Sequence, residues 1–526
     1  MNKMVAVRLG AATLAAVWLL LQAGRRLRAP WLMDAVLLLW SLAAIGWLTI
    51  VVSQHVVFPL HLDLMEGSVL QQTAEAAAGR PMYPIPTPDY APLAYAPLYY
   101  FMAAPLFWFT GPSLPVLRLV AIAGLALSIG LIGTAVWQRT GSRWWAVIAA
   151  GLFAASYRAM DSYLDTAHSD SWMLATALLG TWLLERAHGP TRKTVAVLVL
   201  VASFWFKQHG AFFALGGVTY LVTRDGFRQA LPYAVLAALA GPGLYLLADP
   251  WPMGEAFHYL TYTVPSAWST PEPRAFLRFV RYVATWYPAL GLAAIVGTWR
   301  LCCRWQPPDA WRTQLFAALA TACLGVMDYG SANNVFIPLG AWLILAGSLE
   351  LATAGADHTS RWLPDVRRFA VAVSFAALLY DPREVLVSSR AGTAYADLVA
   401  MIRALPGTVY APFLAWSPDL PNLYPRAHWV AIDDMVRGRG GRILSNRDLA
   451  ETLVGPARHP RGEAWILTNG PLSRAGRVVR DLAACYVLAE DFGNRFEPLA
   501  GTPRRFDHGW PRYLYRHQPT GLCRDS

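Results

Sequence analysis

Ionisable and amide side chains gather in five loops that separate apolar stretches of this sequence. The first loop opens with two carboxylates, Asp63 and Glu66, whose spacing would place both on one face of a helix. Such groups exchange protons and bind polar substrates. At a membrane boundary they are costly unless they are paired or functional. The other four groups lie in the runs 161–170, 207–209, 255–259 and 328–334.

The composition places these loops in a membrane protein. Of 526 residues, 56% are hydrophobic and 15% are charged, and the mean hydropathy is +0.34. Soluble domains carry about 25% charged residues. The apolar residues form blocks of 12 to 23 residues, which is typical of repeated bilayer crossings. The net charge of +11 does not indicate a nucleic-acid partner, because much of the Arg lies in short loops between the blocks.

We predict an all-α transmembrane bundle of about 11 to 12 helices over residues 1–381, because backbone groups in hydrocarbon must bond within a helix. Every second loop is basic, so the positive-inside rule puts the five polar loops on the outer face. Residues 4–23 either cross the membrane or lie on its surface. The stretch 194–223 predicts a short hairpin with its tip below the outer surface. The apolar segments are 4–23, 32–53, 115–137, 144–157, 171–184, 194–206, 210–223, 230–248, 283–299, 313–327, 335–353 and 369–380.

The tail, residues 382–526, differs in pattern from the bundle and predicts a small α/β domain on the outer face. Short apolar runs alternate there with helical patterns, at 407–413, 428–432 and 463–469 and at 394–404 and 472–484. Cys485 and Cys523 would lie in an oxidising compartment, where they either pair or stay as free thiols.

The first outer loop, 61–114, carries three motifs: Asp-x-x-Glu-Gly at 63–67, Gly-Arg-Pro-x-Tyr at 79–83 and Tyr-x-Pro-Leu-Tyr-Tyr at 95–100. Further motifs lie at 163–171, 206–208, 330–338 and 405–409. This ordered set resembles the GT-C-fold glycosyltransferases. It is similar in particular to bacterial relatives of protein O-mannosyltransferases and of the lipid A aminoarabinose transferase. The sequence departs from the family pattern at His168, where an Arg is expected.

The resemblance implies an integral membrane enzyme with a polyprenyl-phosphate-linked sugar as donor. In such enzymes a hydroxyl of a lipid, glycan or protein attacks the anomeric carbon, usually with inversion, and polyprenyl phosphate leaves. The implied location is the bacterial inner membrane, with the active site and the C-terminal domain on the periplasmic side.

That transfer needs a base for the acceptor proton, and Asp63 is our candidate. Glu66 is the alternative base, or it binds the acceptor or a metal. Without such a role, Asp63 would cap a helix or pair with a basic residue. Lys207 would stabilise the departing phosphate, or else only extend to the interface. Asp165 and Asp170 would position the sugar or the donor, or join Asp63 around Mg²⁺ or Mn²⁺.

Several weaker candidates complete the predicted site. Gln208, His168 and Asn334 lie in motifs of the resemblance and are candidates for donor contacts. His258 and Tyr259 lie in a Trp- and Tyr-rich outer stretch, 251–268, and are candidates for contacts with the phosphate or the sugar. Some candidates also have a purely structural alternative. His258 and Tyr259 would lie at the membrane interface, Asn334 would form a tight turn, and Asp170 would cap a helix. Two further candidates, Tyr83 and Tyr99, belong to the first loop.

A multi-pass transporter or flippase of lipid-linked sugars is the alternative function. Transporters of this size commonly show internal repeats or helices broken at matching positions in two halves. No such duplication is visible in this sequence, and an α/β tail is unusual for that class. The sugar and the acceptor class both stay open.

Overall fold

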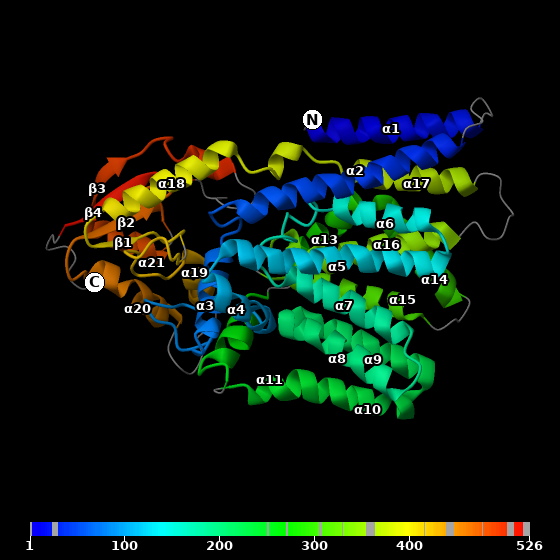
Figure 1. Cartoon of the computed structure of the whole chain (residues 1–526), viewed down its shortest axis with the longest axis horizontal. Helices are drawn as coiled ribbons and strands as arrows, with labels where there is room; N and C mark the ends of the chain where they lie inside the picture. Colours follow the sequence, from blue (N-terminus) through cyan, green and yellow to red (C-terminus); the bar gives the residue numbers. More distant parts are fainter. Residues whose placement is uncertain are drawn as a thin grey trace.

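A long helical bundle and a mixed α/β unit at one end of it make up the computed structural model (Figure 1). It describes residues 3–23, 30–249, 252–269, 272–303, 308–328, 330–353, 363–414, 416–437, 446–475, 477–501 and 510–518.

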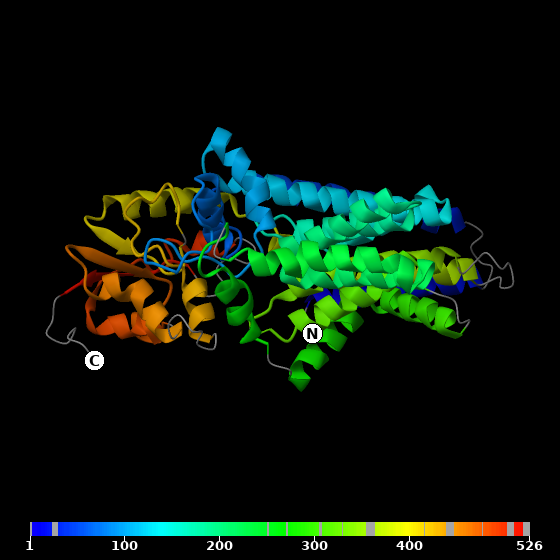
Figure 2. The ribbon, with the colours of Figure 1, turned by 90° about the horizontal axis from the view of Figure 1, so that it is seen from below.

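The bundle contains a helix at each of the twelve predicted apolar segments, and these helices lie side by side in both views (Figures 1 and 2). Large apolar side chains such as Leu14 and Leu215 are exposed on its outside, as expected for a surface that faces lipid. The helices are α1 (Lys3–Ala23), α2 (Pro30–Val57), α5 (Leu114–Thr140), α6 (Arg143–Ala155), α7 (Asp170–Glu185), α8 (Pro190–Phe206), α9 (Ala211–Asp225), α10 with α11 (Phe227–Ala238 and Leu244–Leu247), α14 (Pro288–Cys303), α15 (Ala310–Gly325), α16 (Ile337–Thr353) and α17 (Leu363–Ala377).

Among the described residues, six helical stretches are long and apolar enough to cross a membrane. A seventh results if α13 (Pro273–Trp286) and α14, which meet at 105°, count as one crossing. One of the six, 382–404, belongs to the α/β unit, where it includes α18 (Ser389–Ala404). Several bundle helices are shorter than about 20 residues, the length that spans hydrocarbon; α7 and α8, for example, have 16 and 17 residues.

Small residues let the bundle helices approach closely. A Cβ atom on Gly151 of α6 would lie 2.5 Å from the Cα atom of Ser41 on α2, so the two backbones are in contact at this point. Small residues at such crossings are typical of membrane helices, whose association depends on van der Waals packing.

The first outer loop contains two helices, α3 (Glu66–Ala77) and α4 (Leu98–Thr110), between the bundle and the α/β unit (Figure 1). Helix α3 begins at Glu66, so Asp63 precedes it. The expectation that both acids share one helical face is therefore wrong. The backbone N–H of Met65 instead donates to Asp63 Oδ2 at 2.9 Å.

A four-stranded sheet forms the centre of the α/β unit, in the order β1-β2-β4-β3. Strands β1 and β2 are parallel, while β4 is antiparallel to both of its neighbours. Of the predicted runs, 407–413 contains β1 and 463–469 contains β2, whereas 428–432 is helical rather than a strand. The strands are β1 (Thr408–Tyr410), β2 (Ala464–Thr468), β3 (Tyr486–Asp491) and β4 (Tyr513–His517).

Helices cover both faces of this sheet. Adjacent strand residues point to opposite faces, and Leu467 packs in one apolar cluster with α18 while Ile466 packs in another with α19 (Trp429–Arg437) and α20 (Asn446–Arg458). The pattern at 472–484 forms only short turns of helix, including α21 (Arg477–Arg480). Cys485 is disulfide-bonded; Cys523, its predicted partner, lies outside the described residues.

The α/β unit shares its apolar core with the loops of the bundle. Phe58, Leu60 and Leu62, which follow α2, pack in the same cluster as Leu398 of α18. Residues of α3 and α4 likewise belong to the cluster on the other face of the sheet. The loops at this end of the bundle therefore pack against the α/β unit.

Candidate active site

A buried ion pair fixes the start of the first outer loop. Arg118 of α5 is fully buried, and its guanidinium donates to Glu66 Oε2 at 2.6 Å and to Oε1 at 3.1 Å. The same side chain donates to the carbonyls of His55, Phe58 and Leu60. Glu66 also accepts the backbone N–H groups of Leu62 and Ala167. Both carboxylate oxygens are thus engaged, so Glu66 holds the loop in place rather than facing a substrate.

A second buried pair joins α2 to the next outer loop. Asp165 is fully buried; its Oδ2 lies 2.6 Å from His55 Nδ1, and its Oδ1 accepts the hydroxyl of Tyr157 at 2.6 Å. The other ring nitrogen of His55 lies 2.7 Å from the carbonyl of Val385, just before α18. Asp165 therefore helps to fix the α/β unit on the bundle.

Asp63 accepts fewer hydrogen bonds than Glu66, the other acid of the first outer loop. Its Oδ1 accepts the hydroxyl of Tyr163 at 2.8 Å, and its Oδ2 accepts the Met65 N–H. A carboxylate has about four acceptor positions, and these two bonds leave the others open. Asp63 is only 1% exposed.

Four of the predicted donor-binding residues meet at Asp170, the first residue of α7. Lys207 Nζ lies 2.7 Å from Asp170 Oδ1, and His168 Nδ1 contacts Asp170 Oδ2. The Asn334 amide donates to Oδ2 at 3.4 Å. These residues come from three separate loops, so the fold brings together the tips that the motifs singled out. We call Lys207, Asp170, His168 and Asn334 the Lys207 cluster.

Tyr163 connects the Lys207 cluster to Asp63, and a second tyrosine, Tyr95, packs against the cluster. The ring of Tyr163, whose hydroxyl reaches Asp63, lies edge-on to the His168 ring with 5.6 Å between centroids. Tyr95 contacts the other side of the cluster: its ring is 4.8 Å from that of His168 and 5.8 Å from Lys207 Nζ. Asp63 and Lys207 therefore lie at the same end of the bundle and within one connected group of side chains.

Polar atoms at the cluster are available for a ligand. His168 Nε2 is buried without a hydrogen-bond partner among the described residues, and so are the hydroxyls of Ser169 and Ser171 on either side of Asp170. Buried polar groups are normally bonded, and these three atoms belong to residues next to Asp170 in the chain.

A further acid–base pair lies beside the Lys207 cluster. His209 Nε2 is 3.7 Å from Asp328 Oδ2. Burial, reinforced by the nearby charge of Lys207, lowers the pKa of His209 to about 4. Burial raises the pKa of Asp328 to about 6. At neutral pH this pair therefore consists of a neutral imidazole and an ionised carboxylate.

The remaining predicted residues have contacts of their own outside the cluster. His258 bonds the carbonyl of Tyr245 at 2.7 Å and lies 3.2 Å from Asp249, and it is next to Tyr259 in the chain. Gln208 donates to the carbonyls of Ala94 and Thr261 and so ties two loops together. The hydroxyls of Tyr83 and Tyr99 bond backbone carbonyls, and both rings are buried in a core.

The hydrogen bonds of Asp165 do not suit the metal site that was predicted for Asp63 and Asp165. Both oxygens of Asp165 bond protein groups, and the described residues contain no group of three or more His, Cys, Asp or Glu side chains that could hold an ion. Mg²⁺ and similar ions bind clustered oxygen ligands, so Asp63 and Asp165 fit such a site poorly.

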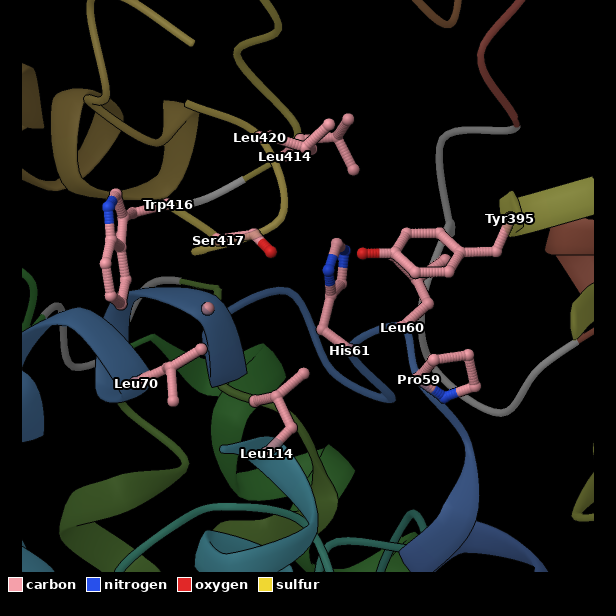
Figure 3. Close-up of a pocket in the computed structure, with 11 residues that line it drawn as sticks. Pro59, Leu60, His61, Leu70, Leu114, Tyr395, Leu414, Trp416, Ser417 and Leu420 are labelled. Atoms are coloured by element: carbon pink, nitrogen blue, oxygen red, sulfur yellow. The ribbon is translucent and has the colours of Figure 1, made fainter. Parts of the chain in front are cut away.

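A pocket opens where the first outer loop meets the α/β unit (Figure 3). It is small, with a cavity volume of about 20 Å³, and is lined mainly by apolar side chains. His61 and the hydroxyl of Tyr395 point toward each other across it, with Ser417 nearby (Figure 3). Asp63, two residues after His61 in the chain, is not among the residues that line this pocket.

Sequence reasoning overlooked the residues that support the site. Arg118 lies inside an apolar segment, where a charge is itself a signal of a buried partner. Tyr163 and Tyr95 stand within the quoted motifs, but nothing in their spacing indicates which of the many tyrosines contacts an acid.

Comparisons with known proteins agree with this architecture. No protein-family profile matches the chain, and no curated protein is significantly similar to it in sequence. ArnT from Cupriavidus metallidurans in the apo state is similar over 90% of this chain and 98% of its own, with 15% identity and a TM-score of 0.50. ArnT from the same organism bound to undecaprenyl phosphate is similar over 95% and 100%, with 14% identity and a TM-score of 0.52. The chain therefore has the same fold as ArnT, which confirms the predicted GT-C fold.

Proposed function

We propose that this chain is a membrane glycosyltransferase that moves a sugar from a polyprenyl-phosphate donor to a lipid, glycan or protein acceptor of the cell envelope. The observation that carries the proposal is the connection of Asp63 to the Lys207 cluster through Tyr163 and His168. The fold similarity to an enzyme solved with bound undecaprenyl phosphate supports a polyprenyl phosphate as the lipid part of the donor.

In this mechanism Asp63 takes the proton of the acceptor hydroxyl. The hydroxyl oxygen forms a bond to the anomeric carbon of the sugar while the bond from that carbon to the phosphate oxygen breaks, with inversion. The Tyr163 hydroxyl and the Met65 N–H orient the carboxylate. General base catalysis of this kind contributes about 10² to 10⁴ in rate.

Lys207 stabilises the negative charge that grows on the leaving phosphate. An ammonium has three donors, and Asp170 accepts one of them at 2.7 Å. The Asp170 carboxylate thereby holds the Lys207 ammonium near its substrate. The buried Nε2 of His168 and the hydroxyls of Ser169 and Ser171 offer further bonds to phosphate or sugar oxygens.

The reaction is proposed for the extracytoplasmic face of a bacterial inner membrane. The basic turns between α5 and α6, α7 and α8, and α9 and α10 lie at the end of the bundle away from the α/β unit (Figure 1). By the positive-inside rule that end is cytoplasmic, which supports an outer location for the Lys207 cluster.

Two substitutions test the proposal in a strain that lacks the gene. Wild-type protein is expected to restore the mass-spectrometric profile of envelope glycans and glycolipids, and Asp63→Asn is expected to fail. Asp397→Asn, on an exposed position of α18, is the matched control and should restore the profile. An unchanged profile on deletion, or full restoration by Asp63→Asn, would overturn the proposal.

Donor binding is tested separately on purified protein with undecaprenyl phosphate as the probe. Lys207→Met should weaken binding, whereas Asp63→Asn should bind as the wild type does. Lys193→Met removes an amine that pairs with Asp225 between α8 and α9, and serves as the control. Equal binding by the wild type and Lys207→Met would contradict the assigned role of Lys207.

A further inference from the structure

Helix α13 is oriented unlike the helices of the bundle. It meets α14 at 105°, with the break at Tyr287, so it runs across the end of the bundle while α14 runs along it. In Figure 2 it is the green helix that projects from the bundle at the lower edge. The predicted apolar segment 283–299 spans this break.

The faces of α13 are sharply divided. Phe279, Val283 and Trp286 pack against the apolar core of the bundle. On the outer side, Phe276 is 71% exposed, Leu277 55% and Val280 44%. At 100° per residue, Arg274, Arg278 and Arg281 form a single polar stripe beside that apolar face.

Two of these arginines form no ion pair with a described residue. Arg274 and Arg281 are exposed and have no acidic partner among the described residues. Arg278 differs, because its guanidinium donates to Ser331 Oγ at 2.9 Å and to Asn333 Oδ1 at 3.1 Å. Arg278 thus fastens α13 to the loop that also carries Asn334 of the Lys207 cluster.

We propose that α13 lies in the headgroup layer of the leaflet next to the α/β unit and binds anionic phospholipids. Phe276, Leu277 and Val280 enter the acyl boundary, while Arg274 and Arg281 contact lipid phosphates. An amphipathic helix with arginines beside an exposed apolar face binds membranes in this way. Continuity with the membrane-spanning α14 places α13 at the required depth. Each arginine near an anionic surface favours binding by about fivefold.

The first test replaces Phe276 with a photo-crosslinking phenylalanine derivative in the full-length protein. The protein is reconstituted in vesicles of phosphatidylethanolamine and phosphatidylglycerol, and lipid adducts are measured by mass spectrometry. We expect adducts at Phe276 and none at Leu488 of β3, an exposed control position of the α/β unit. Absence of lipid adducts at Phe276 would overturn the proposal.

The second test asks whether the arginines select anionic lipid. In equimolar vesicles, adducts to phosphatidylglycerol should exceed those to phosphatidylethanolamine, and Arg274→Gln/Arg281→Gln should reduce that preference by about 25-fold at most, fivefold for each arginine. Arg447→Gln, at an exposed position of α20, should leave the preference unchanged. An equal preference in the wild type and the double variant would overturn the role of the arginines. Because the measurement is an adduct and not sugar transfer, it stands apart from the transferase proposal.

Discussion

Substitution of Glu66 by Gln tests the role of the buried ion pair with Arg118. Both oxygens of Glu66 accept two N–H donors each: Oε1 from Arg118 Nε and Ala167, Oε2 from the Arg118 guanidinium and Leu62. Whichever way a Gln amide is turned, its NH₂ group faces two donors. The substitution also leaves the Arg118 charge buried without a counterion.

The expected loss of stability is about 3 to 5 kcal/mol, the range found when one member of a buried pair is removed. Unfolding of the purified protein in mixed detergent micelles measures it. Glu75→Gln is the matched control in the same helix, since Glu75 pairs with Arg80, whose side chain is 61% exposed. That change should lower stability by less than about 1 kcal/mol.

A double variant identifies the cause of the loss. If the uncompensated Arg118 charge is responsible, Glu66→Gln/Arg118→Met should lose less stability than the sum of the two single variants. A Glu66→Gln protein within about 1 kcal/mol of the wild type would refute this reasoning, because it would mean that water or movement of the loop satisfies Arg118.

Two predictions concern pH. Burial lowers the pKa of His428 to about 4, so between pH 6.5 and pH 4 the unfolded chain binds a proton that the folded chain does not. The free energy of unfolding should therefore fall by about 3 kcal/mol as the pH drops through that window. In an unfolding titration, His428→Gln should flatten this fall. Asp328, with its pKa raised to about 6, binds its proton more tightly when folded, so its contribution is lost as pH rises through 6. Asp328→Asn should therefore stabilise the protein at pH 7.5 and hardly at pH 4, and an equal effect at both values would contradict the assignment.

The bundle was predictable because hydrocarbon imposes simple rules. Runs of apolar residues and basic loops are enough to locate α5 or α16 to within a few residues. The same rules did not predict α13, because three arginines are interspersed with the apolar residues in its sequence and lower its mean hydropathy. Its break from α14 at Tyr287 lies inside a segment that reads as one crossing.

The sequence predicts which loops carry the candidate site, but it does not predict which residues of those loops contact one another. The motifs placed Asp63, Asp170 and Lys207 on one face, and the structure brings the last two within 2.7 Å. The separate roles of Asp63 and Glu66 depend on Arg118, which lies 52 residues from Glu66 in the sequence. Partners at such distances follow from helix packing, which the spacing of residues within one loop does not encode.

The shared interior of the tail and the bundle has a consequence for how this protein can be divided. Phe58 and Leu60 of one part are covered by Leu398 and its neighbours of the other. A chain cut near residue 381 would expose apolar surfaces on both pieces. A chimera carrying the tail of a relative would place apolar surfaces together that do not pack well against each other. Exchanging the tail between relatives would therefore require the loops that pack against it to be exchanged as well.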